Sequence, residues 1–176
     1  MPTEQGNRRN RIDVKRLAIY ALLVSICLIV GYLENLLSIG LSWVVPGVKL
    51  GLSNAVVLVL VCRGDFKGAW AVNITRVCLS ALLFGSPISF LLSLSGGVAS
   101  TAIACVLSRL KSVSAIGVSI AAAVTHNVFQ LLAACVVVGF GVMGISPLLI
   151  ALGAVCGAFC GVLASLVLKH NKIFKL

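Results

Sequence analysis

Acidic residues are scarce in this sequence, and charge of either sign is scarce compared with soluble proteins. The 176 residues include only four Asp and Glu against 14 Lys and Arg, and charged residues make up 10% of the chain. An average soluble domain carries about 25% charged residues. The four carboxylates are scattered, at Glu4, Asp13, Glu34 and Asp65. No Asp-rich motif is therefore present to hold Mg²⁺, which argues against a catalytic site of the chain's own.

Several other motifs that carry chemistry are also missing. The seven cysteines form no C-x-x-C pair and show no metal-type spacing, so we interpret them as small hydrophobic residues and expect no metal site. No G-x-x-x-x-G-K-[ST] loop for ATP occurs. No stretch interleaves aromatic with basic residues, as a site for nucleic acid bases does. These absences predict a protein that has no cofactor and no nucleic acid partner and is not itself an enzyme.

Long apolar stretches dominate instead, since 60% of the residues are hydrophobic. A membrane-spanning helix needs about 20 predominantly apolar residues. Four of six apolar stretches satisfy this, whereas the second is short and the third is borderline. The sequence therefore predicts an all-α integral membrane bundle of six transmembrane helices over 17–170, between basic tails at 1–16 and 171–176. The six stretches are 17–37, 48–62, 68–84, 88–107, 113–138 and 145–168.

The positions of the basic residues predict the orientation of this bundle. With the N-terminus in the cytoplasm, 12 of the 14 Lys and Arg fall on the inner side, and the outer connections around 38–47, 85–87 and 139–147 contain none. This alternation follows the positive-inside rule and depends on all six crossings. We therefore expect a multi-pass protein of the cell (plasma) membrane, with both termini cytoplasmic and with basic residues near anionic membrane lipids.

Polar or charged side chains fall in or at the ends of the first five apolar stretches, and nine of them are candidate site residues. Such groups are costly inside a bilayer and mark a cavity, a pathway or mutual contacts. Under the predicted topology they lie from the middle of the membrane outward, which predicts a solute-binding pocket that opens outward and is sealed inward. The residues are Glu34, Lys49, Asn54, Asn73, Arg76, Ser93, His126, Asn127 and Gln130.

Purely structural roles are open alternatives for single members of this set. Glu34 and Arg76 could neutralise each other as a buried ion pair. Asn73 and Asn127 could join helices through hydrogen bonds, and Lys49 could snorkel to the outer headgroups. A packing role alone does not explain why the whole set gathers toward one leaflet of the membrane.

Three segments resemble a known family. PGVKLGLSNAVVLVLV (46–61), RVCLSALLFGSPISFLLSLSGGVAS (76–100) and AAAVTHNVFQLLAA (121–134) resemble the Gx transporter family, also labelled heptaprenyl diphosphate synthase component I. That family is in turn similar to the substrate-binding S components of energy-coupling factor (ECF) importers. The resemblance implies six helices, a solute site near the outer surface, and partnership with a membrane coupling subunit and ATPases. It also implies that Ala21 and Ser25 contact the coupling subunit through a small-residue face.

The leading hypothesis is a membrane-embedded S component of an ECF-type importer in a prokaryotic cell membrane, which captures a small anionic or amphipathic solute from outside. Arg76, with Lys49 nearby, would anchor the anionic group, Glu34 would orient Arg76 or neutralise a cation, and the amide and His side chains would set specificity. The alternative is a non-catalytic membrane subunit for heptaprenyl or polyprenyl diphosphate synthesis in isoprenoid quinone formation. A membrane enzyme acting on a lipid is a third possibility, disfavoured by the scarcity of carboxylates.

Overall fold

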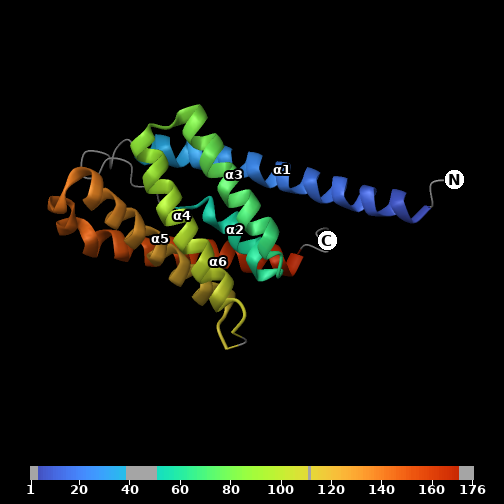
Figure 1. The fold of residues 1–176 in the computed structure, drawn as a ribbon. Coiled ribbons are helices and arrows are strands. Elements are labelled where there is room, and N and C mark those ends of the chain that lie inside the picture. Colours follow the sequence, from blue (N-terminus) through green and yellow to red (C-terminus); the bar gives the residue numbers. More distant parts are fainter. Residues whose placement is uncertain (1–3, 39–50, 111, 171–176) are drawn as a thin grey trace.

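The computed structural model describes residues 4–38, 51–110 and 112–170, and these residues form a bundle of six α-helices with one short 3₁₀ helix (Figure 1). The apolar composition of the stretches accounts for this, because a helix satisfies its backbone hydrogen bonds internally. Three helix starts carry side-chain caps from Asp65, Ser86 and Ser114. The elements are α1 (Glu4–Ser38), α2 (Asn54–Cys62), α3 (Phe66–Phe84), α4 (Pro87–Leu107), α5 (Ala115–Val138), η1 (Phe140–Ile145) and α6 (Ser146–His170).

Four segments of the described chain are long and apolar enough to cross a membrane: Val14–Glu34, Pro87–Leu107, Ala115–Val138 and Phe140–His170. The prediction of an all-helical fold is confirmed, and the four candidate spans support a multi-pass membrane protein. Helix α2 has nine residues, or about 14 Å at 1.5 Å per residue, which is half the hydrocarbon thickness of a bilayer. The polar groups of α3 reduce its hydropathy. Six full crossings and their orientation therefore remain predictions.

Helix α1 begins much earlier than the apolar stretch that starts at residue 17. Its first turns run through the basic segment 4–16, so most of the predicted tail is helical. Glu, Gln, Arg and Lys are good helix formers, and extending an existing helix avoids the cost of starting a new one. Figure 1 shows this N-terminal half projecting beyond the other helices.

Contacts between α1 and α3 give the direction of the helices. The Tyr20 hydroxyl donates to Asp65 Oδ2 at 2.5 Å, just before α3 begins. The rings of Tyr32 and Phe84 lie 5.1 Å apart, at the far ends of the same two helices. Helices α1 and α3 therefore run in the same direction, as the predicted alternation of crossings requires.

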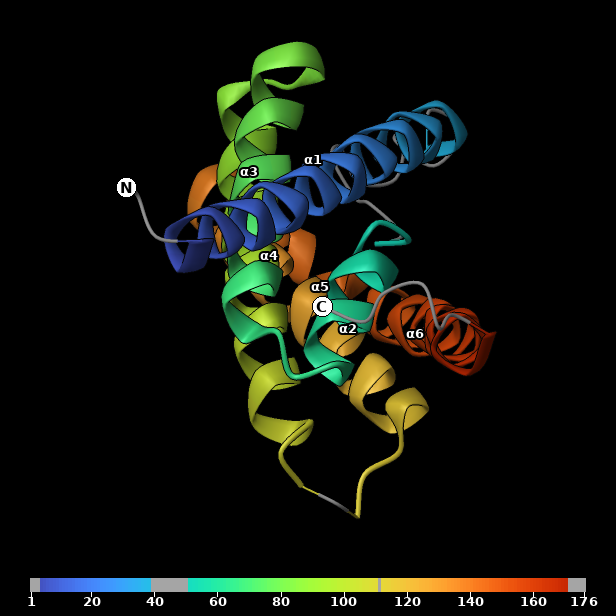
Figure 2. The same ribbon diagram turned by 90° about the vertical axis from the view of Figure 1, so that its right-hand side faces the viewer.

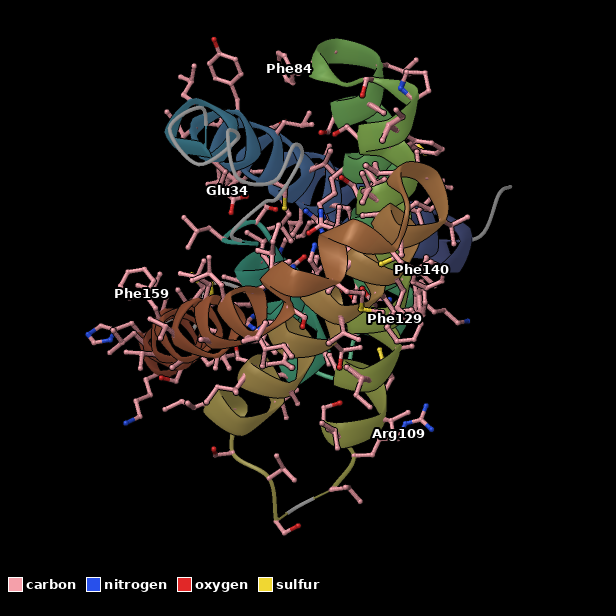
Figure 3. The ribbon with its side chains drawn as sticks, turned by 90° about the vertical axis from the view of Figure 1, so that its left-hand side faces the viewer. Glu34, Phe84, Arg109, Phe129, Phe140 and Phe159 are labelled. Atoms are coloured by element: carbon pink, nitrogen blue, oxygen red, sulfur yellow. The ribbon has the colours of Figure 1, made fainter. Side chains whose placement is uncertain are left out.

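Basic residues gather at the end of the bundle where α3 starts. The Arg109 guanidinium lies 5.1 Å from the centre of the Phe66 ring, which brings the chain just beyond the C-terminal end of α4 to this end. Arg63 and Lys67 flank the same turn in sequence. We call this end, defined by Arg63, Lys67 and Arg109, the basic end. Figure 3 shows Phe84 and Arg109 at opposite ends of the molecule.

Helices α5 and α6 pack closely because glycines face the contact. A Cβ built on Gly157 would lie 2.8 Å from Ile120 Cα, and one on Gly161 would lie 2.8 Å from Ile116 Cα. Both distances are too short for a real side chain, so only glycine allows this approach. Figure 2 shows α1 crossing the front of the bundle, with the C-terminal end of α6 toward the viewer.

Candidate functional site

The site is centred on Arg76, whose guanidinium donates to three neutral oxygens. Its Nη1 donates to Ser53 Oγ at 2.5 Å, its Nη2 to Asn54 Oδ1 at 2.6 Å, and its Nε to Asn73 Oδ1 at 3.0 Å. Two of these partners lie at the start of α2 and the third lies one turn earlier on α3. A charged donor makes stronger hydrogen bonds than a neutral one. This network therefore fixes Arg76 and ties α3 to the start of α2.

Asn73 connects this network to α4. Its side chain is 1% exposed, and its Nδ2 donates to the backbone oxygen of Gly97 at 2.9 Å. A Cβ on Gly97 would lie 3.2 Å from Asn73 Nδ2, so glycine leaves room for this contact. On the next residue, a Cβ at Gly96 would lie 2.9 Å from His126 O and from its ring. The two glycines thus let the buried polar groups of α3 and α5 pack against α4.

Glu34 holds the turn that precedes α2 from the side of α1. Its side chain is 1% exposed, and its Oε1 accepts from Leu52 N at 2.6 Å. Cys27 Sγ, two turns earlier on α1, lies 3.7 Å from Ser53 O. The residues 51–54 are therefore held between a carboxylate on α1 and a guanidinium on α3.

A cavity of about 30 Å³ lies between these groups. Its walls come from α1, the start of α2, α3, α4 and α5, and include Glu34, Asn54, Arg76, Ser93 and His126. Polar groups from the first five predicted spans thus face one shared volume. The volume holds only one or two water molecules, so it is too small for a solute in this conformation. A ligand must displace part of the wall in order to enter.

The other predicted site residues have different surroundings. Asn127 donates to Leu149 O of α6 at 2.8 Å, which is the interhelical hydrogen bond of the structural alternative. Gln130 is buried on α5, and it does not line the cavity. Lys49 lies outside the described residues. Ala21 and Ser25 are exposed on α1, where Ser25 Oγ donates to Ala21 O at 2.9 Å. Their contact with a coupling subunit remains a prediction.

Several residues of the site, among them Ser53, Cys27 and Ser80, were not among the predicted site residues. Ser53 accepts from Arg76, and Cys27 lines the cavity. Ser53 directly precedes Asn54, so its position next to a predicted site residue was a usable signal. Cys27 carried no such signal, because a lone cysteine in an apolar stretch is usually a packing residue.

The fold and the site together define the class of protein. Within its described residues this is a helical membrane protein with a half-buried arginine, held by neutral oxygens, beside a small polar cavity. Among those same residues, no three His, Cys, Asp or Glu side chains come close enough to hold a metal ion.

A family model described as heptaprenyl diphosphate synthase component I matches residues 23–167, and the chain belongs to this family. No curated protein and no solved structure matches the chain. The predicted membership of this family is thereby confirmed. The further relation to S components of ECF importers remains a prediction.

Proposed function

We propose that the chain is a non-catalytic membrane component of a system that makes prenyl diphosphates. The observation that carries this proposal is the family match over most of the chain. Assembly of prenyl diphosphates by the usual enzymes relies on paired aspartates that hold Mg²⁺. The two acidic side chains that the structure describes are far apart: Glu34 binds Leu52, and Asp65 binds Tyr20 at the basic end. Catalysis would therefore belong to a soluble partner.

Co-purification tests this proposal. The full chain is tagged at its C-terminus, extracted from its native membrane in mild detergent, and its partners are identified by mass spectrometry. We expect a soluble prenyltransferase to be retained, and to be lost when the basic end is altered by the double variant Arg63→Glu, Lys67→Glu. Retention of a membrane coupling subunit and ATPases, with no prenyltransferase, would contradict it.

The Arg76 network supports a second candidate, an importer component that captures an anionic solute. A guanidinium at membrane depth is costly and is retained mainly for function. The neutral oxygens of Ser53, Asn54 and Asn73 orient Arg76 without cancelling its charge. Ser93 in the same cavity wall adds a hydroxyl donor for the anion, whereas the Glu34 carboxylate in that wall can accept only from a donor group of the solute and so restricts which anions fit. An anion could thus bind beside the guanidinium, with the remaining groups selecting its shape.

Arg76→Ala tests this second candidate. The variant should lose binding of the co-purifying anion, while Arg109→Ala at the basic end should keep it. The fraction of each variant that is inserted and helical is measured by extraction yield and circular dichroism. Equal anion binding by the wild type and by folded Arg76→Ala would remove Arg76 from the site.

A further inference from the structure

Two small cavities in the bundle share a wall. The polar cavity beside Arg76 and a second cavity of about 20 Å³ are both lined by Gly51 and Asn54. The second cavity lies between α2, α4, α5 and α6 and is lined mainly by apolar side chains, among them Val57, Leu58 and Ala122. Polar and apolar compartments are therefore neighbours, separated by residues that precede or begin α2.

An anion bound to Arg76 would displace the Asn54 side chain, which forms part of this wall. Its Oδ1 is the neutral acceptor of Arg76 Nη2 at 2.6 Å. An anionic oxygen is a stronger acceptor for a guanidinium than an amide oxygen, and a phosphate or carboxylate can accept from two guanidinium nitrogens at once. An anion bound to Arg76 therefore competes directly with Asn54, and an Asn54 side chain turned aside no longer separates the two cavities.

Ser93 adds a second contact for such an anion. Its Oγ is buried in the polar cavity and has no hydrogen-bond partner among the residues that the structure describes. Buried hydroxyls are nearly always bonded. A ligand oxygen between Arg76 and Ser93 would satisfy this hydroxyl from α4 while the guanidinium holds the charge from α3.

The second cavity has the chemistry of a site for a short hydrocarbon. Ala104 on α4, Ala122 and Ala123 on α5, and Gly157 on α6 line it with small side chains. The hydroxyl of Ser100, also in its wall, already donates to Gly97 O at 3.1 Å. Thr101 and Ser119 also lie in the wall, but most of the lining is apolar. At about 20 Å³ the cavity is too small for a hydrocarbon chain as it stands, so a tail also needs the space that Asn54 vacates, and the small side chains limit its length.

We propose that the site takes an amphipathic anion, with a phosphate or carboxylate head on Arg76 and Ser93 and a short hydrocarbon tail in the compartment beside Ala122. This inference rests on the proposed binding of an anion at Arg76 and adds the class of ligand and the residues that select its tail. Asn54 separates the two compartments when the site is empty and moves aside when the head binds.

A series of alkyl phosphates tests the inference on the full-length protein in detergent. Inorganic phosphate, methyl phosphate and n-butyl phosphate are titrated by calorimetry, and Arg76→Ala provides the background from micelle partitioning. Burial of each methylene corresponds to about a fourfold gain in affinity, so n-butyl phosphate should bind well over tenfold more tightly than methyl phosphate. Acetate and pentanoate, used in the same way, show whether the head is a phosphate or a carboxylate.

Variants of the second cavity, where the tail would bind, distinguish this inference from the proposed function on which it rests. Ala122→Leu, or Ala104→Val if the first variant misfolds, should abolish the gain from methyl to butyl and leave methyl phosphate binding unchanged. Ala151→Leu, on an exposed position of α6, is the matched control and should keep the gain. Binding of short anions with no gain along the series would overturn the tail site alone. No Arg76-dependent binding of any anion would overturn both proposals.

Discussion

Replacement of Asn73 by Ala offers a quantitative check on how Arg76 is held, because the bundle contains a matched control. Asn73 and Asn127 are both buried, and each donates from Nδ2 to a backbone oxygen of a neighbouring helix, at 2.9 and 2.8 Å. Only Asn73 also accepts a hydrogen bond from Arg76. The difference in stability between Asn73→Ala and Asn127→Ala therefore isolates the contact with the guanidinium.

The magnitude follows from the contacts that each variant loses. Both lose one amide hydrogen bond between helices, worth about 0.6 kcal/mol in a membrane protein, and both leave a similar void. Asn73→Ala also removes a hydrogen bond to a charged group, worth about 1.5–3 kcal/mol. We expect Asn73→Ala to reduce the free energy of unfolding by about 1.5–3 kcal/mol more than Asn127→Ala does.

Reversible unfolding in mixed micelles measures this difference. The purified variants are titrated from mild detergent into SDS and helix content is followed by circular dichroism. Equal losses for the two variants, or a larger loss for Asn127→Ala, would mean that Asn73 does not hold the guanidinium in the folded protein. The geometry of the whole Arg76 network would then be wrong.

Two further predictions use the same unfolding assay. Gly157→Ala should destabilise the bundle by about 1–3 kcal/mol through overpacking, because its Cβ would lie 2.8 Å from Ile120 Cα. The control Gly141→Ala, whose Cβ would have nothing within 4 Å, should change the free energy of unfolding by less than about 0.5 kcal/mol. Equal effects of the two variants would refute the close packing of α5 on α6. Asp65→Ala should cost about 2 kcal/mol, because it removes both the cap of α3 and the bond from Tyr20. Tyr20→Phe removes only the bond to Asp65 and should cost about half as much. An equal or larger cost would mean that the cap of α3 contributes nothing to the loss.

Composition and apolar length predicted most of the fold. The stretches 88–107, 113–138 and 145–168 correspond to α4, α5 and α6 with ends that differ by no more than two residues. Polar connections flank these helices, and the bilayer requirement for about 20 apolar residues sets their length. The helices could therefore be predicted from local sequence without knowledge of their neighbours.

The start of α2 could not be predicted in the same way. The apolar stretch begins near 48, yet α2 begins at Asn54, and Gly51 has a φ of 80°, which a helix does not allow. Long-range bonds from Glu34 to Leu52 and from Arg76 to Asn54 fix the backbone ahead of α2. Such contacts override local helix propensity, and no pattern of residues near position 50 reveals them.

For the polar residues as well, the sequence predicted the shared location but not the individual hydrogen-bond partners. Membrane depth and helical spacing predicted that Glu34, Arg76 and His126 face one volume, and the structure brings all three to one cavity wall. The partners could not be predicted, since two similar asparagines have different ones. Asn73 binds both Gly97 and Arg76, whereas Asn127 binds Leu149. Helix rotation and crossing angle decide such contacts, and packing of distant segments sets both.

Native mass spectrometry of the chain released from its own membrane tests the central claim about the site most directly, namely that Arg76 anchors an anionic ligand. Wild type and Arg76→Gln are compared at equal yield and equal helix content. The account predicts a bound organic anion of defined mass on the wild type and its loss from the variant. The same adduct on both proteins, or none on the wild type, would contradict it.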